Sequence, residues 1–498
     1  MRPISLYSAL RYFPLSSLRS MPLPQVSINS VTSQATRVGP QTAYVCIRGT
    51  AHDGHDDIKK AVKNKAAVIF LQDETYCHLC QTVPYVLVRN TREVLSYLAF
   101  ALYDIAPNDF TVIGVTGTNG KTSVAFYLTQ ILRKSGLRCA MLSTVVDDID
   151  GQCFPATHTT PPPQELAKRF AQCKRRGIRY IVMEVSSHAL EQARVAAIDY
   201  TLGIFTNLTE DHLDYHGDME HYFAAKARLF TQCKYALLNA DDPAAKRMSS
   251  FTPHGAVVRF YSAEGTRESD FAALQRDKEA NCYYLLGGHA FFPVKLPTIG
   301  AFTVSNTLAA LSAALMLHIP YTQIEAAAKE LHAPSGRMEP IHTHKGVVAY
   351  IDYAHTPDAL EKALRALRDS LPQKKIHVLF GCGGDRETQK RAQMGAIASK
   401  LADYCVITSD NSRSEDPGEI ISQILEGFDL QCPHRVIVGR QCAIHHLLEH
   451  AGDDTVLLLA GKGHENYEID QTGKHPFSEK KILAWYDASI HTSDPSPL

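Results

Sequence analysis

Short apolar runs alternate with longer stretches of helical periodicity along most of this chain. Runs of four or five apolar residues between helices are typical of parallel strands that are covered on both faces. The pattern therefore predicts an α/β fold with parallel sheets. The runs lie at residues 112–115, 180–183, 202–205, 235–238, 347–351, 376–380, 404–407, 435–438 and 456–459.

Changes in this pattern divide the chain into three parts. The first part has β-like runs at 43–47 and 66–70, a helical stretch at 58–63 and a longer predicted helix at 91–104. A breaker sequence with Pro and Asn follows that helix. At 498 residues the chain is too long for one ordinary core. We therefore expect three domains, at residues 1–107, 108–335 and 336–498.

Composition and charge exclude several classes of protein. The 51 Lys and Arg residues balance 52 Asp and Glu residues, so nucleic acid is not an expected partner. No run approaches the roughly 18 apolar residues that span a bilayer, so no membrane span is expected. The 12 scattered cysteines fit a reducing compartment. Cys77 and Cys80 form a lone CxxC without a second pair, and we interpret them as ordinary thiols.

The N-terminal stretch is basic. Arg2, Arg11 and Arg19 precede the first acidic residue, Asp53, without the continuous apolar stretch of a signal peptide. An organelle transit peptide has this composition, and so does a short basic extension of a cytoplasmic protein. We expect a cytoplasmic location.

A glycine-rich stretch at 117–123 follows one predicted strand and precedes a helical segment at 124–134. Its glycines let backbone N–H groups approach an anion, Lys121 can reach terminal phosphates, and the hydroxyl of Thr122 or Ser123 can ligate Mg²⁺. The usual phosphate-loop spacing would place a further glycine where this chain has valine. A glycine-rich turn without a ligand is the alternative. The strand, lysine and hydroxyls together predict binding of ATP or GTP.

Polar residues follow two further predicted strands. Glu184 ends one strand, and His212 lies after another, where ligands of doubly wound sheets bind. Both could serve a Mg²⁺ ion beside a nucleotide phosphate, although a solvated loop residue is the simpler interpretation of either alone. His212 and His216 have the spacing of a helical zinc pair, but Asp214 and Gly217 make a continuous helix doubtful.

Lys226 lies in a helical run at 221–230, among neighbours that are aromatic or apolar. A lysine on such a face either extends its ammonium group to solvent or finds a charge partner. The sequence leaves both possibilities open. The neighbours one turn away are Tyr222, Phe223, Leu229 and Phe230.

The third part carries polar residues after its predicted strands. Asp352 could accept hydrogen bonds from a ribose, or it could cap a helix or be solvated. A glycine-rich turn ends in Arg386, and Arg413 and Glu465 follow two other strands. Guanidinium groups suit carboxylates and a carboxylate suits an ammonium group. These three residues predict a pocket for a zwitterion, with ordinary surface charges as the alternative.

Together these segments resemble the Mur ligase family, over residues 26–479. The resemblance implies a UDP-substrate-binding domain, a central P-loop-type ATPase domain on a parallel sheet, and a C-terminal Rossmann-like domain for an amino acid. It also implies an ATP- and Mg²⁺-dependent ligase of peptidoglycan synthesis, in which an amine attacks an acyl phosphate. We expect a monomer. The segments that carry the resemblance are residues 117–122, 184–188, 205–216, 352–357, 381–386 and 461–465.

The family's site residues carry over by matching position. The resemblance implies catalytic roles for Lys121, Glu184, His212 and a carbamylated Lys226, and it implies metal ligands at Thr122, Glu184, His212 and Lys226. The nucleotide residues are Gly117, Thr118, Asn119, Gly120, Lys121, Thr122, Ser123, Asn306, Arg337 and Asp352. The residues for the UDP-sugar and the muramoyl peptide are Val31, Ser33, Thr50, Ala51, His52, Thr159, Thr160, Ser186, Gln192 and Arg194. The residues for the incoming amino acid are Arg386, Asp410, Asn411, Ser412, Arg413, Gly461 and Glu465.

Two positions depart from the family's pattern. Thr32-Ser33-Gln34 stands where Asp-Ser-Arg is usual, so the uridine contacts are less well matched. Ser412 replaces the proline of Asp-Asn-Pro-Arg, the motif for meso-diaminopimelate, but Arg413 remains and can hold a distal carboxylate. Because L-lysine has no such carboxylate, we expect meso-diaminopimelate to be added to UDP-N-acetylmuramoyl-L-alanyl-D-glutamate.

Other functions remain open at this point. The enzymatic alternatives are an L-lysine-adding form and another ligase of the Mur or folylpolyglutamate type. A regulatory or transport ATPase would use the phosphate loop without ligase chemistry. That last alternative leaves the charged loops after the C-terminal strands unexplained.

Overall fold

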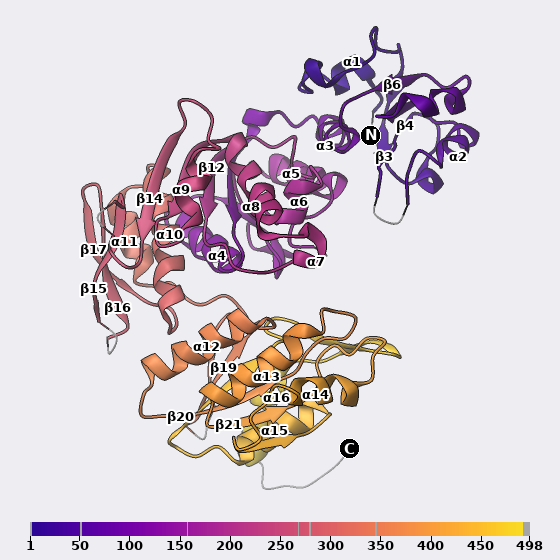
Figure 1. The fold of residues 1–498 in the computed structure, drawn as a ribbon. Helices are drawn as coiled ribbons and strands as arrows, with labels where there is room; N and C mark the ends of the chain where they lie inside the picture. The colour runs from indigo at the N-terminus through magenta and orange to yellow at the C-terminus, as the bar shows by residue number, and fades with distance from the viewer. Residues whose placement is uncertain are drawn as a thin grey trace. The chain divides into compact units, whose positions relative to one another are not determined.

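The computed structural model describes residues 2–49, 52–156, 158–266, 268–277, 280–343 and 346–491, with side chains as far as residue 485. Contacts divide the chain into two compact units, Met1–Arg259 and Phe260–Leu498, whose elements Figure 1 shows. Both units contain parallel sheets, so the predicted α/β class is confirmed. The division into three domains at residues 107 and 335 stays a prediction.

The N-terminal part of the first unit is built on a parallel sheet in the order β3-β4-β5-β6. Its two inner strands are completely buried. Helix α2 has its predicted bounds, whereas α3 ends two residues before the predicted end, where Asp104 takes up a left-handed φ of 53°. The elements are β1 (Ile4–Ser5), α1 (Leu6–Ala9), β2 (Ser27–Ile28), β3 (Ser30–Thr32), β4 (Thr42–Val45), α2 (Ile58–Lys63), β5 (Val68–Leu71), β6 (Tyr85–Leu87) and α3 (Thr91–Leu102).

A second parallel sheet follows in the first unit. Its core has the order β8-β11-β7-β12-β13, and the antiparallel strands β9 and β10 extend it beyond β8. Because β7, β11 and β12 are parallel neighbours, their carboxyl ends meet at one edge of the sheet. The strands are β7 (Thr111–Thr116), β8 (Cys139–Leu142), β9 (Val146–Ile149), β10 (Gln152–Pro155), β11 (Tyr180–Glu184), β12 (Tyr200–Phe205) and β13 (Cys233–Asn239).

Helices connect these strands. Helix α4 begins at Lys121, three residues before the predicted helix, directly after Gly120 with its left-handed φ of 86°. Helix α8 ends at Ala227, and a 3₁₀ helix at Arg228–Gln232 replaces the predicted last turn. The helices are α4 (Lys121–Lys134), α5 (Pro163–Arg175), α6 (Ser187–Glu191), α7 (Leu213–His216), α8 (Met219–Ala227) and α9 (Ala244–Ser249).

The second unit contains an antiparallel meander that the apolar runs did not predict. Strands β15, β16 and β17 pair in sequence, and β14 runs parallel to β15. Buried and exposed residues alternate along β17, so no continuous apolar run marks it. The elements are β14 (Val257–Ser262), β15 (Phe271–Asp277), β16 (Cys282–Gly287), β17 (Ala290–Lys295), α10 (Ala301–Met316) and α11 (Tyr321–Ala328).

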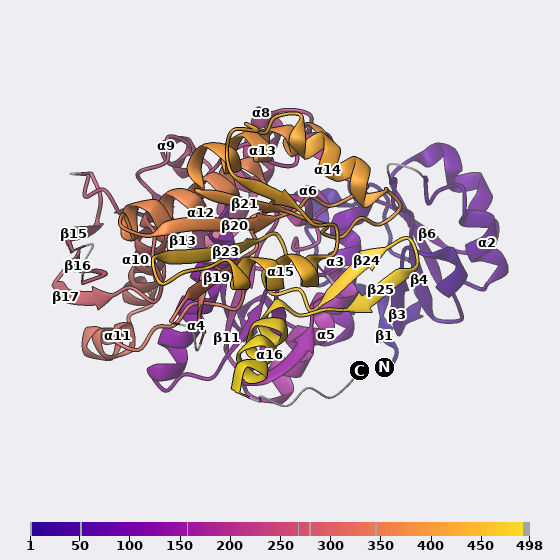
Figure 2. The ribbon, with the colours of Figure 1, turned by 90° about the horizontal axis from the view of Figure 1, so that it is seen from below.

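The rest of the second unit is a three-layer structure around a sheet of order β18-β19-β23-β20-β21-β22. All neighbours are parallel except β18 and β19. Apolar residues of α12, α13 and α14 form one core cluster and those of α15 and α16 another, on opposite faces, as Figure 2 shows.

The strands of this part lie within two residues of their predicted bounds where an apolar run marks them. Strand β18 and the hairpin β24 and β25 lack such a run and were not predicted. The elements are β18 (Glu339–His342), β19 (Val348–Asp352), α12 (Pro357–Ser370), β20 (Lys375–Phe380), α13 (Gln389–Leu401), β21 (Tyr404–Ile407), α14 (Pro417–Leu425), β22 (His434–Val436), α15 (Arg440–Glu449), β23 (Thr455–Ala460), β24 (Tyr467–Asp470), β25 (Gly473–Pro476) and α16 (Glu479–His491).

Candidate active site

The phosphate loop after β7 is held against the segment that follows β12. Gly117 has a φ of 145°, and a Cβ atom there would lie 1.9 Å from Thr206 Oγ1, so the position requires glycine. The N–H of Thr118 donates to the Asn207 carbonyl (2.8 Å), and the N–H of Asn119 donates to Asn207 Oδ1 (2.9 Å). These contacts fix the shape of the loop.

Two lysines converge on the carbonyl of Gly117. Lys121 Nζ donates to Gly117 O (2.9 Å) and Thr118 O (2.8 Å), and Lys226 Nζ donates to Gly117 O (2.8 Å). Lys226 is only 1% exposed and lies over the Tyr222 ring, so the alternative that it extends to solvent is wrong. Burial and the charge of Lys121 lower the pKa of Lys226 well below its usual value. This shift makes the neutral amine more accessible than in an exposed lysine.

A buried carboxylate lies beside the hydroxyl of the phosphate loop. Thr122 Oγ1 donates to Glu184 Oε1 (2.9 Å), and Glu184 is 1% exposed at the end of β11. The N–H of Thr144 donates to the same oxygen (2.8 Å). Thr144 Oγ1 lies 3.1 Å from Glu184 Oε2 and 3.1 Å from Thr159 Oγ1. The structure thus brings two predicted metal ligands, Thr122 and Glu184, into direct contact.

The residues assigned to the muramoyl peptide form a hydrogen-bond network at the same strand end. Thr160 Oγ1 donates to the Glu184 carbonyl (2.8 Å) and accepts from the Ser186 N–H (3.0 Å). Arg194 donates to the Thr160 carbonyl (2.8 Å) and to Gln192 Oε1 (2.7 Å). Burial lowers the pKa of Arg194. These predicted residues, distant in sequence, are neighbours in the structure.

His212 immediately precedes α7 with a left-handed φ of 56°. His212 is thus the N-cap of the short helix that contains His216, whose N–H donates to the His212 carbonyl (3.0 Å), and the zinc interpretation stays untested. The rings of His188 and His212 are 4.9 Å apart. Partial burial lowers the pKa of His212 and the charge of Asp211 opposes this effect, so the net shift favours a neutral imidazole that can ligate a metal. Within the described ranges, no group of three or more His, Cys, Asp or Glu side chains could hold a metal ion.

The residues assigned to the UDP-sugar belong to the N-terminal sheet. Val31 is buried in β3, Ser33 follows that strand, and the side chain of His52 is exposed. Thr50 and Ala51 lie outside the described residues. The assignment of a UDP-sugar to these positions stays a prediction.

Three residues assigned to the nucleotide lie in the second unit. The carboxylate of Asp352, at the end of β19, accepts from the N–H groups of Met338 (2.7 Å) and Ala354 (2.8 Å). Burial raises the pKa of Asp352, and the charge of Arg337 opposes this effect. Asn306 is buried in α10. Asp352 is thus held by backbone groups and does not cap a helix.

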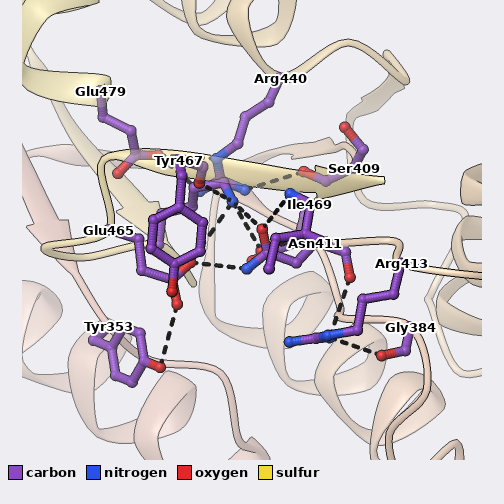
Figure 3. A network of polar contacts seen from close by, with 12 residues as sticks. Tyr353, Gly384, Ser409, Asn411, Arg413, Arg440, Glu465, Tyr467, Ile469 and Glu479 are labelled. Carbon is purple, nitrogen blue, oxygen red and sulfur yellow. Dashed lines mark hydrogen bonds and ion pairs between the residues drawn. The ribbon is translucent and has the colours of Figure 1, made fainter. Parts of the chain in front are cut away.

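Three loops at the carboxyl ends of strands converge around Asn411. Asn411 Nδ2 donates to Glu465 Oε2 (2.8 Å), and Arg413 Nη1 donates to the carbonyls of Gly384 (2.7 Å) and Asn411 (3.3 Å). Figure 3 shows Asn411 between the side chains of Glu465 and Arg413. A carboxylate and a guanidinium group, the pair expected for a zwitterion, therefore lie on either side of one amide.

The other residues assigned to the amino acid surround this amide less closely. Gly461 has a φ of 114°, and a Cβ atom there would lie 2.5 Å from Asp410 Oδ2, so this turn requires glycine. Ser412 is buried. Arg386 is exposed and donates to the carbonyl of its neighbour Asp385 (3.1 Å).

Buried charges that the sequence did not single out complete the network. Arg440 is fully buried, and it donates to Glu479 Oε1 (2.8 Å) and to the Ala460 carbonyl (2.7 Å). Lys462 is also fully buried and lies 3.3 Å from Asp410 Oδ1. The position of Lys462 between two glycines of a strand-end turn was a usable signal. Arg440 begins a helix with an ordinary pattern, so its sequence gives no such signal.

Comparisons with known proteins decide the family. Residues 115–314 match the Mur ligase middle domain, and residues 336–463 match the Mur ligase, glutamate ligase domain. A protein of Clostridioides difficile (strain 630), named UDP-N-acetylmuramoyl-L-alanyl-D-glutamate--2,6-diaminopimelate ligase, is 37% identical over 92% of this chain and 94% of its own length. The chain belongs to the Mur ligase family.

Further comparisons place this chain in the same family. A protein of Geobacillus kaustophilus (strain HTA426) with the same name as the Clostridioides relative is 38% identical over 91% of this chain and 94% of its own length. A solved structure of a ligase of that name has a TM-score of 0.71 at 26% identity and covers 99% of this chain and 100% of its own. MurF from Acinetobacter baumannii, at 17% identity and a TM-score of 0.58 over 93% of this chain and 96% of its own, shares the fold. The predicted family and fold class are confirmed.

The helices that the structure describes in this Mur ligase do not have the combined length and hydropathy of a membrane span. Across the part of the chain that the structure describes, every helix is too short or too polar to cross a bilayer. The predicted lack of a membrane-spanning helix is confirmed for that part.

Proposed function

We propose that this Mur ligase joins meso-diaminopimelate to UDP-N-acetylmuramoyl-L-alanyl-D-glutamate and uses ATP to activate the carboxylate. One observation carries this proposal: a relative that bears the name of this activity matches 92% of the chain at 37% identity. Two sites in the structure contain suitable groups. They are the phosphate loop with Glu184 and the loops around Asn411.

The phosphate loop has the groups to hold the phosphates of ATP. Helix α4 begins at Lys121, and its N-terminal N–H groups favour an anion. The oxygen atoms of Thr122 and Glu184, 2.9 Å apart, fit Mg²⁺, which prefers hard oxygen ligands. Bound Mg²⁺ would supply positive charge that stabilises the transferred phosphoryl group. Lys121 would add a second positive charge there.

Lys226 has the environment of a lysine that accepts CO₂. A neutral amine forms the N–C bond of a carbamate and releases one proton to solvent, and the lowered pKa of Lys226 favours that neutral form. The resulting anion would lie close to Lys121, whose ammonium group shares the Gly117 carbonyl with Lys226. We therefore propose that Lys226 is carbamylated and serves Mg²⁺ together with His212.

The muramoyl peptide is proposed to bind along the network of Thr159, Thr160, Ser186, Gln192 and Arg194. The hydroxyl of Thr144 bridges the side chains of Thr159 and Glu184. A substrate bound at Thr159 would therefore be near the proposed metal ligands. Transfer of the γ-phosphate to the substrate carboxylate gives an acyl phosphate. Attack by the amine of the amino acid then forms the amide bond and releases phosphate.

The charges around Asn411 favour an amino acid with an additional carboxylate. Glu465 can hold an ammonium group, and Arg413 can hold a carboxylate at the distal centre. L-lysine would leave the guanidinium group of Arg413 without that carboxylate. This difference supports meso-diaminopimelate over the L-lysine-adding alternative.

Phosphate release tests the proposed function. The protein is incubated with ATP, Mg²⁺ and UDP-N-acetylmuramoyl-L-alanyl-D-glutamate, with meso-diaminopimelate, L-lysine or no amino acid. We expect fast release only with meso-diaminopimelate. Equal rates with L-lysine would reject the proposed amino acid, and release without the UDP substrate would support an ATPase without ligase chemistry. The cytoplasmic location, the monomeric state and the nucleotide and UDP contacts stay predictions.

A further inference from the structure

Lys462 is a fully buried lysine in the turn that follows β23. The glycines on either side of it allow its close packing, because a Cβ atom at Gly461 would meet Asp410 at 2.5 Å and one at Gly463 would meet Tyr353 at 2.7 Å. With an exposed fraction of 0%, Lys462 has no surface with which to touch a substrate. Any role in the reaction must act through its neighbours.

The ammonium group of Lys462 has one acceptor for each of its three protons. Its Nζ atom donates to Asn411 Oδ1 (2.8 Å), to the Tyr467 carbonyl (3.0 Å) and to Asp410 Oδ1 (3.3 Å). Two of these acceptors lie in the loop after β21, and the third lies in the β24 strand of the hairpin. Lys462 therefore joins the distant loop after β21 to the hairpin that begins with β24.

These contacts determine which way the Asn411 amide points. Asn411 Oδ1 accepts from Lys462 Nζ and also from the Ile469 N–H (3.0 Å). An amide turned by 180° would place its NH₂ group against these two donors, which is unfavourable. Asn411 must therefore present Nδ2 to Glu465, where it donates to Oε2 (2.8 Å). Because the ammonium group of Lys462 needs Asn411 Oδ1 as an acceptor, this is the one favourable orientation of the Asn411 amide.

This arrangement helps to hold the carboxylate of Glu465 in place. Its side chain is 11% exposed, its Oε1 accepts from the Tyr353 hydroxyl (3.5 Å), and its Oε2 lies 3.8 Å from Lys462 Nζ. Figure 3 shows the Tyr353 and Asn411 contacts on this carboxylate. A carboxylate fixed at both oxygens can receive an ammonium group with less loss of side-chain entropy than a mobile one.

We propose that Lys462 is a positioning residue for the incoming amino acid, which orients Asn411 and, through it, the carboxylate of Glu465. This inference rests on the proposed function, because it assumes that Glu465 binds the ammonium group of the amino acid. According to this inference, Lys462 affects recognition of the incoming amino acid and of no other substrate. A lysine that only balanced the buried charge of Asp410 would affect stability instead.

Steady-state kinetics of Lys462→Met and Lys462→Arg test the proposal. Arginine keeps the positive charge, but its planar fork does not reproduce the three contacts, so this variant serves if methionine prevents folding. We expect both folded variants to raise KM for meso-diaminopimelate by about tenfold or more. We expect KM for ATP and for the UDP substrate to stay within about twofold. Lys375→Met, at an exposed lysine paired with Asp454, is the control.

The outcomes distinguish failure of the proposed function from failure of the positioning role of Lys462. If wild-type protein releases no phosphate in response to meso-diaminopimelate, the proposed function fails. If the wild type is active but Lys462→Arg keeps every KM and lowers only kcat or thermal stability, the positioning role is wrong and Lys462 is structural. Unchanged kinetics in both variants would also overturn it.

Discussion

The hydroxyl of Thr122 donates a hydrogen bond to Glu184 Oε1 across 2.9 Å. Thr122 lies in the first turn of α4, and Glu184 ends β11, the strand that pairs with β7. The contact therefore joins the phosphate loop to a neighbouring strand end. In the proposed reaction, these two oxygen atoms would be ligands of Mg²⁺.

Glu184→Gln tests this pair. The glutamine keeps the shape and can still contact Thr122, but it lacks the negative charge that a divalent cation requires. We expect kcat to fall by about 100-fold or more, with the loss partly restored at high Mg²⁺, in a phosphate-release assay. Glu191→Gln, at a partly exposed carboxylate paired with Arg228, is the matched control. Wild-type kcat at every Mg²⁺ concentration would contradict the role of Glu184.

Gly117→Ala tests the close packing of the phosphate loop. Its Cβ atom would lie 1.9 Å from Thr206 Oγ1, so the loop must shift away from the segment after β12. We expect a loss of about 1–3 kcal/mol in the free energy of unfolding and much weaker nucleotide binding. Chemical denaturation and nucleotide titration measure the two effects. Gly39→Ala, where nothing lies within 4 Å, should change neither, and equal behaviour of the two variants would refute the packing argument.

The pH dependence of stability tests the environment of Lys226. Because burial lowers the pKa of Lys226 in the folded protein, the unfolded chain binds more protons between that value and its usual pKa. Stability should therefore rise with pH in this window. In CO₂-depleted buffer, we expect the unfolding free energy of the wild type to increase relative to that of Lys226→Met as the pH rises toward the usual lysine pKa of 10.5. Parallel curves for the two proteins would argue against a depressed pKa.

Glu415 gives a second pH-dependent prediction, in a more acidic range. The side chain of Arg391 and the N–H of Asp385 lower its pKa from 4.5 to about 2. Its contribution to stability is therefore complete above about pH 4.5 and is lost as the pH falls toward about 2. We expect Glu415→Gln to cost about 1–3 kcal/mol at neutral pH, because Arg391 is fully buried. The difference from wild type should shrink in acid, and a constant difference would exclude this pair as its origin.

Arg413→Ala tests the choice of amino acid. Loss of the guanidinium group should raise KM for meso-diaminopimelate by about tenfold or more and leave KM for ATP within about twofold. The assay is phosphate release at varied concentrations of each substrate. Arg365→Ala removes an exposed guanidinium group that pairs with Glu361, and it should have no effect. An unchanged KM for meso-diaminopimelate in Arg413→Ala would reject the assigned role.

The sequence predicted the longer parallel strands because most of them are buried and appear as apolar runs, but it missed the short parallel strands β3, β6 and β8. The meander was missed because alternate residues of β17 are exposed, and the hairpin was missed because most of β24 and β25 is polar. These strands depend on their partners and have no strong pattern of their own. Helix bounds shifted mainly where a residue adopts a left-handed φ, as at Gly120 and Asp104.

The site was predicted from motifs, and its supporting residues were not. Lys121, Thr122 and Glu184 lie in recognisable strand-end segments, whereas Thr144 reaches Glu184 from a loop without a motif. The glycines on either side of Lys462 marked its turn, but only the structure shows that this lysine is buried. A charged residue in a loop is usually solvated, so tertiary packing decides such cases.

The identity of the product tests the central claim most directly. The protein is given ATP, Mg²⁺, UDP-N-acetylmuramoyl-L-alanyl-D-glutamate and equal amounts of meso-diaminopimelate and L-lysine, and the UDP-linked products are separated and weighed by mass spectrometry. We predict a product that carries meso-diaminopimelate, formed one for one with released phosphate. A lysine-containing product would contradict the amino-acid assignment, and phosphate release without any new UDP-linked product would contradict ligase chemistry itself.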